Sequence, residues 1–210
     1  MNKVINLHDV HDKQWLNQLL IYLKRRYTLI SATELESHIY NEQHLTNFCH
    51  ITVDDGDRTF YDVVYPLLKQ HNIPATLFVS PKIILDQGNF WFQEIKCYDE
   101  LELKNALSTY LGVKLNMLTP YDLMHIFKTL NLSQIKGIIS YYKTQVNQPD
   151  VESYNLNIDQ IHEIANNSLI SIGAHTLNHP ILSNEDNKSS EEEILGSING
   201  LNEILGYNIK

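Results

Sequence analysis

Hydrophobic residues recur along the chain in two patterns, as short apolar runs and as longer stretches with helical spacing. The runs predict strands at residues 4–7, 27–30, 48–53, 73–79 and 169–174. Helical spacing predicts helices at residues 15–26, 60–68, 158–165 and 191–205. Ser31 and Glu34 have the spacing of a capping box, which predicts a further helix through Ile39. Because strands alternate with helices, we expect an α/β fold with a parallel sheet.

Local features refine this expectation. Pro66 lies inside a helical segment, so we expect a kink or an early end there. Residues 90–147 have a helical pattern without a strand, which predicts a helical insertion. Within it, Thr119 is expected to cap a helix that begins at Pro120 and has Asp122 in its first turn. The polar residues 184–190 predict a loop before the last helix.

Composition limits the class of protein. A length of 210 residues with 43% hydrophobic residues and no internal repeat predicts a single globular domain over residues 1–210. The formal net charge of −9 would repel phosphate backbones and anionic lipids, so we expect neither nucleic acid nor a membrane surface as a partner. No apolar run has the length of a membrane span, and residues 1–9 lack the apolar region of a signal peptide, which predicts a cytoplasmic protein. Cys49 and Cys97 are predicted to be free and mostly buried.

Two short polar motifs follow predicted strands. Asp54, Asp55 and Gly56 come after strand 48–53, and residues 175–180 (HTLNHP) come after strand 169–174. The carboxyl ends of parallel strands meet at one edge of a sheet, so the motifs are expected to lie together. Two carboxylates and two imidazoles are the side chains of a hydrolytic zinc-type site. In such a site three donors hold an ion with one position open for water, and a further carboxylate acts as base.

The local sequence suits this arrangement. Neighbouring side chains on a strand point to opposite faces, and Gly56 lets the backbone turn so that Asp54 and Asp55 can both reach the site. His175 and His179 are four residues apart, which would put both rings on one face of a helical turn. Imidazole with carboxylate favours zinc, and cobalt, nickel, iron and manganese fit the same ligand types.

Each motif alone is weak evidence, because an Asp-Asp-Gly triplet is usually a turn and two histidines four apart are often a surface coincidence. Their joint occurrence at two strand ends is much stronger evidence. His8, at the end of the first predicted strand, is a further candidate for contact with the site. We interpret residues 90–92 (FWF) as packing and residues 191–193 (EEE) as a favourable charge at a helix start.

The motifs resemble those of a known family. Residues 52–56 (TVDDG) are similar to the T-F-D-D-G motif of the NodB-like polysaccharide deacetylases, carbohydrate esterase family 4. Residues 175–180 are similar to their H-[ST]-x-x-H-P motif. Residues 65–68 and 73–79 also match the family, so the likeness spans nearly the whole chain, with Val53 in place of the usual Phe.

The resemblance implies a distorted (β/α) barrel in which Asp54 is the general base. It implies Asp55, His175 and His179 as ligands of a divalent ion, Zn²⁺ first, with Co²⁺, Ni²⁺, Fe²⁺ or Mn²⁺ as alternatives. It also implies a glycan substrate, deacetylated at N-acetylated sugars of a polysaccharide or of the cell envelope, so that a cytoplasmic chain could still have an envelope-associated function.

The resemblance stops at the C-terminal end of the sequence. Family members continue past the last helix with further motifs, including a late His that serves as general acid, and no residue here matches that acid. We therefore expect a barrel that is incomplete at its C-terminus, from a truncated chain or in a homo-oligomer whose second subunit covers the open edge.

Three interpretations follow from the sequence. The first is an active metal-dependent deacetylase, and the second is a catalytically impaired metal- or glycan-binding remnant of the same family. The third is a structural α/β domain whose two motifs never meet. Acetate release separates the first two, and metal content separates both from the third.

Overall fold

The structure is a computed structural model that describes residues 1–40, 44–147, 149 and 151–209. The described residues form the strands β1 (Lys3–Leu7), β2 (Thr28–Leu29), β3 (Phe48–Val53), β4 (Ala75–Val79) and β5 (Ile170–Ala174). The helices that alternate with or flank these strands are α1 (Lys13–Arg26), α2 (Ala32–Ile39), the π-helix η1 (Phe60–Val64), α3 (Tyr65–His71), α4 (Pro81–Asp86), α10 (Ile158–Ala165), the 3₁₀-helix η2 (Leu182–Asn184) and α11 (Asn187–Leu205).

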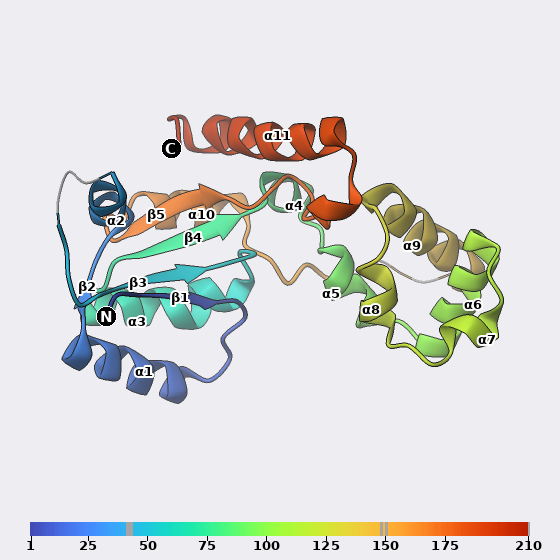
Figure 1. Ribbon diagram of the computed structural model, residues 1–210, viewed down its shortest axis with the longest axis horizontal. Helices are drawn as coiled ribbons and strands as arrows, with labels where there is room; N and C mark the ends of the chain where they lie inside the picture. The colour runs from blue at the N-terminus through green and yellow to red at the C-terminus, as the bar shows by residue number, and fades with distance from the viewer. Residues whose placement is uncertain (41–43, 148, 150, 210) are drawn as a thin grey trace.

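The strands form one parallel sheet in the order β1-β3-β4-β5, and β2 pairs with the first two residues of β3. The register places Asn6 opposite Thr52, Thr52 opposite Thr76, and Thr76 opposite Ser171. All carboxyl ends therefore lie at one edge, where Figure 1 shows the loops that leave β3 and β5. The predicted α/β class with a parallel sheet is confirmed.

The two faces of the sheet differ because successive side chains on a strand alternate. Cys49, Ile51 and Val53 of β3, with Leu77 and Val79 of β4, are buried in the main core. Helices α1, α3 and α10 supply the other side of this core, and Figure 1 shows α1 and α3 along one side of the sheet. Burial of apolar area drives this packing, and it fixes the strand ends that bear the two motifs.

The opposite face of the sheet is more polar and borders a groove of about 470 Å³ between the sheet, α2 and residues 207–209. His50 is buried there and bonds through its two ring nitrogens to Ile30 O at 2.8 Å and Thr76 Oγ1 at 3.0 Å. Among the described residues no strand joins β1 to β5, so the sheet is open. This agrees with the expected incomplete barrel; its covering by a second subunit stays a prediction.

The predicted insertion is confirmed as a set of helices with a core of its own. It contains α5 (Trp91–Ile95), α6 (Glu100–Leu111), α7 (Leu115–Leu118), α8 (Leu123–Phe127) and α9 (Leu132–Val146). Phe127, Ile135 and Ile138 are fully buried within it. Figure 1 shows the insertion beyond the carboxyl ends of the strands, so that α5 lies next to the loops of the sheet.

Three local predictions need correction. Pro66 does not end its helix: the chain stays helical from η1 into α3, and the irregularity that accommodates a residue without an N–H is the π-helical turn directly before it. Thr119 does not begin a helix but lies at the C-cap of α7; α8 begins later, and the Asp122 side chain caps it by accepting from Met124 N at 2.8 Å. Residues 187–190 are helical rather than loop, because Asp186 caps α11 through Ser189 N.

The two cysteines are free as predicted, but only one of them is buried. Cys49 is buried, whereas Cys97 is exposed and lies in the turn that follows α5. Within the part of the chain that the structure describes, no helix is long and apolar enough to cross a membrane.

Candidate active site

The acidic motif begins where β3 ends. Asp54 N still donates to Leu7 O at 2.9 Å, and then the chain turns through two left-handed residues, Asp55 with φ 73° and Gly56 with φ 74°. A side chain at Gly56 would meet Val79 Cγ1 at 2.8 Å from its Cβ, so only glycine fits. The turn expected from Gly56 is therefore present, and it includes Asp55 itself.

The histidine motif follows β5 as an irregular loop. The expectation of a helical turn is wrong: Thr176 has φ 60° and His179 has φ 57°, values that no right-handed turn contains. Thr176 Oγ1 donates to His175 O at 2.6 Å and accepts from His179 N at 3.1 Å, which closes the loop. Ser80 Oγ adds a bond to His175 O at 2.8 Å. A loop folded back by these bonds brings the two rings together.

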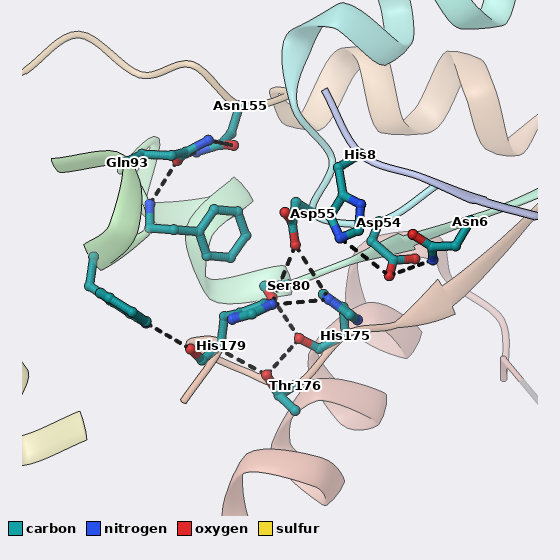
Figure 2. A network of polar contacts seen from close by, with 12 residues as sticks. Asn6, His8, Asp54, Asp55, Ser80, Gln93, Asn155, His175, Thr176 and His179 are labelled. Atoms are coloured by element: carbon teal, nitrogen blue, oxygen red, sulfur yellow. Dashed lines mark hydrogen bonds and ion pairs between the residues drawn. The ribbon is translucent and has the colours of Figure 1, made fainter. Parts of the chain in front are cut away.

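Asp55, His175 and His179 converge on one point, as Figure 2 shows. Asp55 Oδ1 lies 3.3 Å from His175 Nε2 and 3.4 Å from His179 Nε2, and the two Nε2 atoms are 3.1 Å apart. The sequence separates these side chains widely, and the parallel sheet brings them to one place. This contradicts the third interpretation of the sequence, a structural α/β domain whose two motifs never meet.

The geometry fits a tetrahedral ion. Bonds of about 2.0–2.1 Å from zinc to nitrogen and oxygen imply ligand atoms about 3.3–3.4 Å apart, close to the three distances in this cluster. Asp55 Oδ1 is buried and has no partner in hydrogen-bond geometry among the described residues. A buried carboxylate oxygen that lies within 3.4 Å of two imidazole nitrogens but forms no well-aligned hydrogen bond with either is arranged as a shared cation would require.

The protonation states also suit metal binding, which needs an ionised carboxylate and neutral imidazole. Burial alone would raise the pKa of Asp55, but the close approach of His175, together with the charges of His179 and His8, outweighs burial and lowers that pKa below its ordinary value. Burial lowers the pKa of His179, and this effect exceeds the opposing attraction of Asp55.

Asp54 lies beside this cluster with a separate set of contacts. Its Oδ2 accepts from Asn6 Nδ2 at 2.8 Å and lies 3.9 Å from His8 Nε2. Its Oδ1 is buried and has no hydrogen-bond partner among the described residues. Figure 2 shows Asp54 above the ring of His175, between His8 and Asn6. His8, a further candidate from the sequence, thus reaches the site.

The insertion forms a wall of the site. Phe90 and Phe92 meet the ring of His179 edge-on, with centroids 5.4 and 5.2 Å away, and Trp91 Nε1 donates to His179 O at 3.0 Å. Interpreting residues 90–92 as packing is right for the buried Phe90, but Phe92 also borders a cavity beside Asp55. The three aromatic residues therefore hold His179 from the side opposite the sheet.

A cavity of about 550 Å³ opens next to Asp55. Aromatic, acidic and basic side chains line it together: His8, Asp9, His11, Asp55, Asp57, Phe92, Gln93, Lys96, Cys97 and Tyr154. Gln93 is fixed by a reciprocal pair of bonds to Asn155, at 3.0 and 2.8 Å, which ties α5 to the segment before α10, and Asn155 in turn pairs with Asp57. Asp55 thus connects the cluster to a space large enough for a sugar-sized ligand.

Sequence reasoning missed several residues that position the site. Asn6 holds Asp54, Ser80 holds His175, and Glu193 accepts from Leu177 N and Asn178 N. Interpreting Glu193 as a helix-start charge is wrong, because its side chain is buried and bonded to the histidine loop. Glu193 lies four residues before Ser197 and eight before Leu201, on the buried stripe of α11. This helical spacing was the sequence signal that could have predicted its burial.

Comparison with known proteins agrees with the fold and the motifs. The sequence matches the model of the polysaccharide deacetylase family over residues 41–105 and 119–210, which is most of the chain. No curated protein matches it.

Among solved structures, the deacetylase PplD of Streptococcus pyogenes, in complex with acetate, superimposes with a TM-score of 0.60 at 16% identity, over 99% of this chain and 70% of that one. IcaB from Ammonifex degensii gives 0.59 at 18% identity, over 99% and 71%. A de-N-acetylase from Aggregatibacter actinomycetemcomitans gives 0.58 at 15% identity, over 99% and 76%. At these identities the likeness shows a shared fold.

The family match covers both motifs, and the fold it implies is the one observed. The chain belongs to the polysaccharide deacetylase family and is a hydrolase of carbon–nitrogen bonds other than peptide bonds.

Proposed function

We propose that this chain is a metal-dependent deacetylase that removes acetyl groups from N-acetylated sugars of a polysaccharide or cell-envelope glycan. Asp55, His175 and His179 would hold one divalent ion, and Asp54 would be the general base. The observation that carries the proposal is the convergence of one carboxylate oxygen and two imidazole nitrogens within 4.8 Å of one another.

The donor set favours zinc. One oxygen and two nitrogens are the ligands of many catalytic zinc sites, and cobalt, nickel, iron and manganese accept the same donors. When bound, such an ion lowers the pKa of water and polarises the carbonyl under attack. Asp55 lines the neighbouring cavity, from which a substrate would approach.

Asp54 is suited to accept a proton. The bond from Asn6 orients the carboxylate through Oδ2, which leaves the buried Oδ1 without a partner among the described residues. A fixed carboxylate beside the ligand cluster can take the proton of an attacking water as that water adds to the acetyl carbonyl. Asp55 and Asp54 would thereby divide the tasks of ligand and base, because their surroundings differ.

The cavity has the chemistry of a carbohydrate subsite. Phe92 and Tyr154 offer apolar ring faces, while Asp9, Asp57 and Lys96 offer groups that bond to hydroxyls. A neutral N-acetylated sugar brings no charge that would be repelled by an acidic protein of net charge −9.

Acetate release from N-acetylglucosamine oligomers, with added zinc or cobalt, tests the proposal. We expect release by the parent chain, release about 100- to 10,000-fold slower by Asp54→Asn, and unchanged release by Glu191→Gln, a surface control on α11. A chain that binds an ion stoichiometrically but releases no acetate would be the binding remnant instead of the enzyme. Equal rates for the parent and Asp54→Asn would remove Asp54 as base.

A further inference from the structure

Glu193 is an acid on the buried side of a helix. It is 7% exposed, less than any other Asp or Glu that the structure describes, while its neighbours Glu191 and Glu192 face solvent. A carboxylate leaves water at a large cost unless charge-assisted hydrogen bonds replace its hydration. The partners of Glu193 therefore indicate why the side chain is there.

Those partners belong to the loop between the two histidines. Glu193 Oε2 accepts from Leu177 N at 2.9 Å and from Asn178 N at 2.8 Å, and Oε1 accepts from Asn178 Nδ2 at 2.7 Å. All three donors lie in the stretch of chain that separates His175 from His179. The carboxylate of Glu193 thus attaches the middle of this loop to α11.

Asn178 extends the network to the insertion. Lys136 Nζ, on α9, donates to Asn178 Oδ1 at 2.8 Å, so the amide accepts on one side and donates to Glu193 on the other. One turn after Glu193, a Cβ at Gly196 would lie 3.2 Å from Leu177 Cδ2, which shows how closely α11 approaches the loop. The histidine loop is therefore held between α11 and α9.

The loop needs such support because its backbone is strained. Thr176 and His179 both have left-handed φ values, which are uncommon for a residue with a side chain and strained for a β-branched residue such as Thr176. The bonds to Glu193 fix the two peptide groups that lie between these strained residues. Without them the loop can relax, and the His175 and His179 rings would separate.

We propose that Glu193 is a positioning residue for the metal ligands. Its carboxylate, bonded to the backbone of Leu177 and Asn178, keeps the rings of His175 and His179 at the spacing one ion requires. This inference rests on the proposed metal site and extends it, since Glu193 itself touches no ligand atom. Residues that orient metal ligands typically change affinity about 10- to 100-fold when they are replaced.

The first arm of the test is the affinity for Zn²⁺, measured on metal-free protein by competition with a chromogenic chelator. We expect Glu193→Gln to bind Zn²⁺ about 10- to 100-fold more weakly than the parent, because an amide cannot accept from all three donors. Glu191→Gln, the same change two residues earlier on the exposed side of the helix, should bind as the parent does.

The second arm is a rescue. Combining Glu193→Gln with Asn178→Asp reverses donor and acceptor in the pair: the new amide N–H donates to a new carboxylate, whose other oxygen still accepts from Lys136. The oxygen of the new amide remains to accept from the two backbone N–H groups. We expect the double variant to recover most of the lost affinity, whereas Asn178→Asp alone places two carboxylates together and weakens binding.

A third readout does not need metal. In the metal-free protein, amide hydrogen exchange at Leu177 and Asn178 should be faster in Glu193→Gln than in the parent, and unchanged in Glu191→Gln. Should Glu193→Gln fail to fold, Asn178→Ala replaces it. It removes the side-chain links of the loop to Glu193 and Lys136, so Zn²⁺ affinity should fall below that of the parent and of Glu191→Gln, and an unchanged affinity would overturn the positioning role.

The outcomes separate the two proposals. A parent chain that binds no Zn²⁺ would overturn the proposed metal site, and with it the positioning role. A parent that binds Zn²⁺ while Glu193→Gln binds equally well would overturn the role of Glu193 alone. Loss in Glu193→Gln without any recovery in the double variant would contradict the hydrogen-bond pairing described for Glu193 and Asn178.

Discussion

Asn6 donates a hydrogen bond from Nδ2 to Asp54 Oδ2 over 2.8 Å and a second one to Thr52 Oγ1 over 3.0 Å, joining β1 to the end of β3. The parallel register, which sets Asn6 opposite Thr52, makes this contact possible. The carboxylate that we propose as base is thus oriented from the neighbouring strand and not from its own loop.

Replacing Asn6 should therefore affect catalysis without affecting metal binding. We expect Asn6→Ala to lower kcat for acetate release about 10- to 100-fold, because Asp54 loses the bond that aims it. Zn²⁺ affinity should stay at the parent value, since Asn6 contacts no member of the ligand cluster. Steady-state kinetics measures kcat, and a parallel Zn²⁺ titration measures the metal affinity. If kcat and Zn²⁺ affinity fell by the same factor, Asn6 would not act on the base alone.

Gly56 should tolerate substitution poorly. Gly56→Ala combines a left-handed φ with a Cβ 2.8 Å from Val79 Cγ1, so we expect at least about 3 kcal/mol lost from the free energy of unfolding. Gly112→Ala is the matched control, because Gly112 has φ 66° and open space around it. That variant should lose only about 1 kcal/mol. Urea unfolding of both variants measures the difference; equal losses would show that the close approach to Val79 is unimportant.

Acid should destabilise the metal-free protein in two stages. Burial lowers the pKa of His179 below 6.5, and burial also lowers the pKa of His50, so the unfolded state binds more protons near that pH. Stability is then fully present above about pH 6.5 and is lost as pH falls through the folded-state pKa values of the two histidines. The lowered pKa of Asp55 adds a further loss below its ordinary 3.8.

The first stage can be assigned by substitution. The free energy of unfolding in urea, with a chelator present, should fall between about pH 7.5 and about pH 5.5, and His179→Asn should fall less steeply. Adding His50→Asn should further reduce the pH dependence of the free energy of unfolding. A His179→Asn variant with the full slope of the parent would show that His179 is not held neutral by the fold.

Removing a ligand should weaken metal binding more than removing a residue that orients one. We expect His179→Ala to bind Zn²⁺ at least about 100-fold more weakly than the parent. His125→Ala is a suitable control, because His125 lies on the surface of α8 with its side chain 83% exposed. Equilibrium dialysis of the two variants checks the prediction, and equal binding would remove His179 from the proposed ligand set.

Much of the fold and part of the site follow from local sequence signals. The bounds of β3 and α10 are as predicted, because apolar runs and helical spacing are strong signals over those segments. The order of strands and helices was enough to place Asp54, Asp55 and the two histidines at one edge of the sheet.

Other features depend on contacts between distant segments. The four-residue spacing of His175 and His179 resembles a helical turn, yet the loop is left-handed at His179 because Thr176, Trp91 and Glu193 hold it so. Neither the bond from Asn6 nor the burial of Glu193 has a local signature, since both arise from register and packing.

The central claim is that Asp55, His175 and His179 share one ion, and X-ray absorption at the zinc K-edge of zinc-loaded protein tests it most directly. We predict one zinc per chain, with a first coordination sphere of nitrogen and oxygen only, about 2.0–2.1 Å from the metal, and with the scattering pattern of two imidazoles. His175→Ala should lose one of these imidazoles. A stoichiometry far below one, sulfur in the coordination sphere, or two imidazoles persisting in His175→Ala would contradict the account.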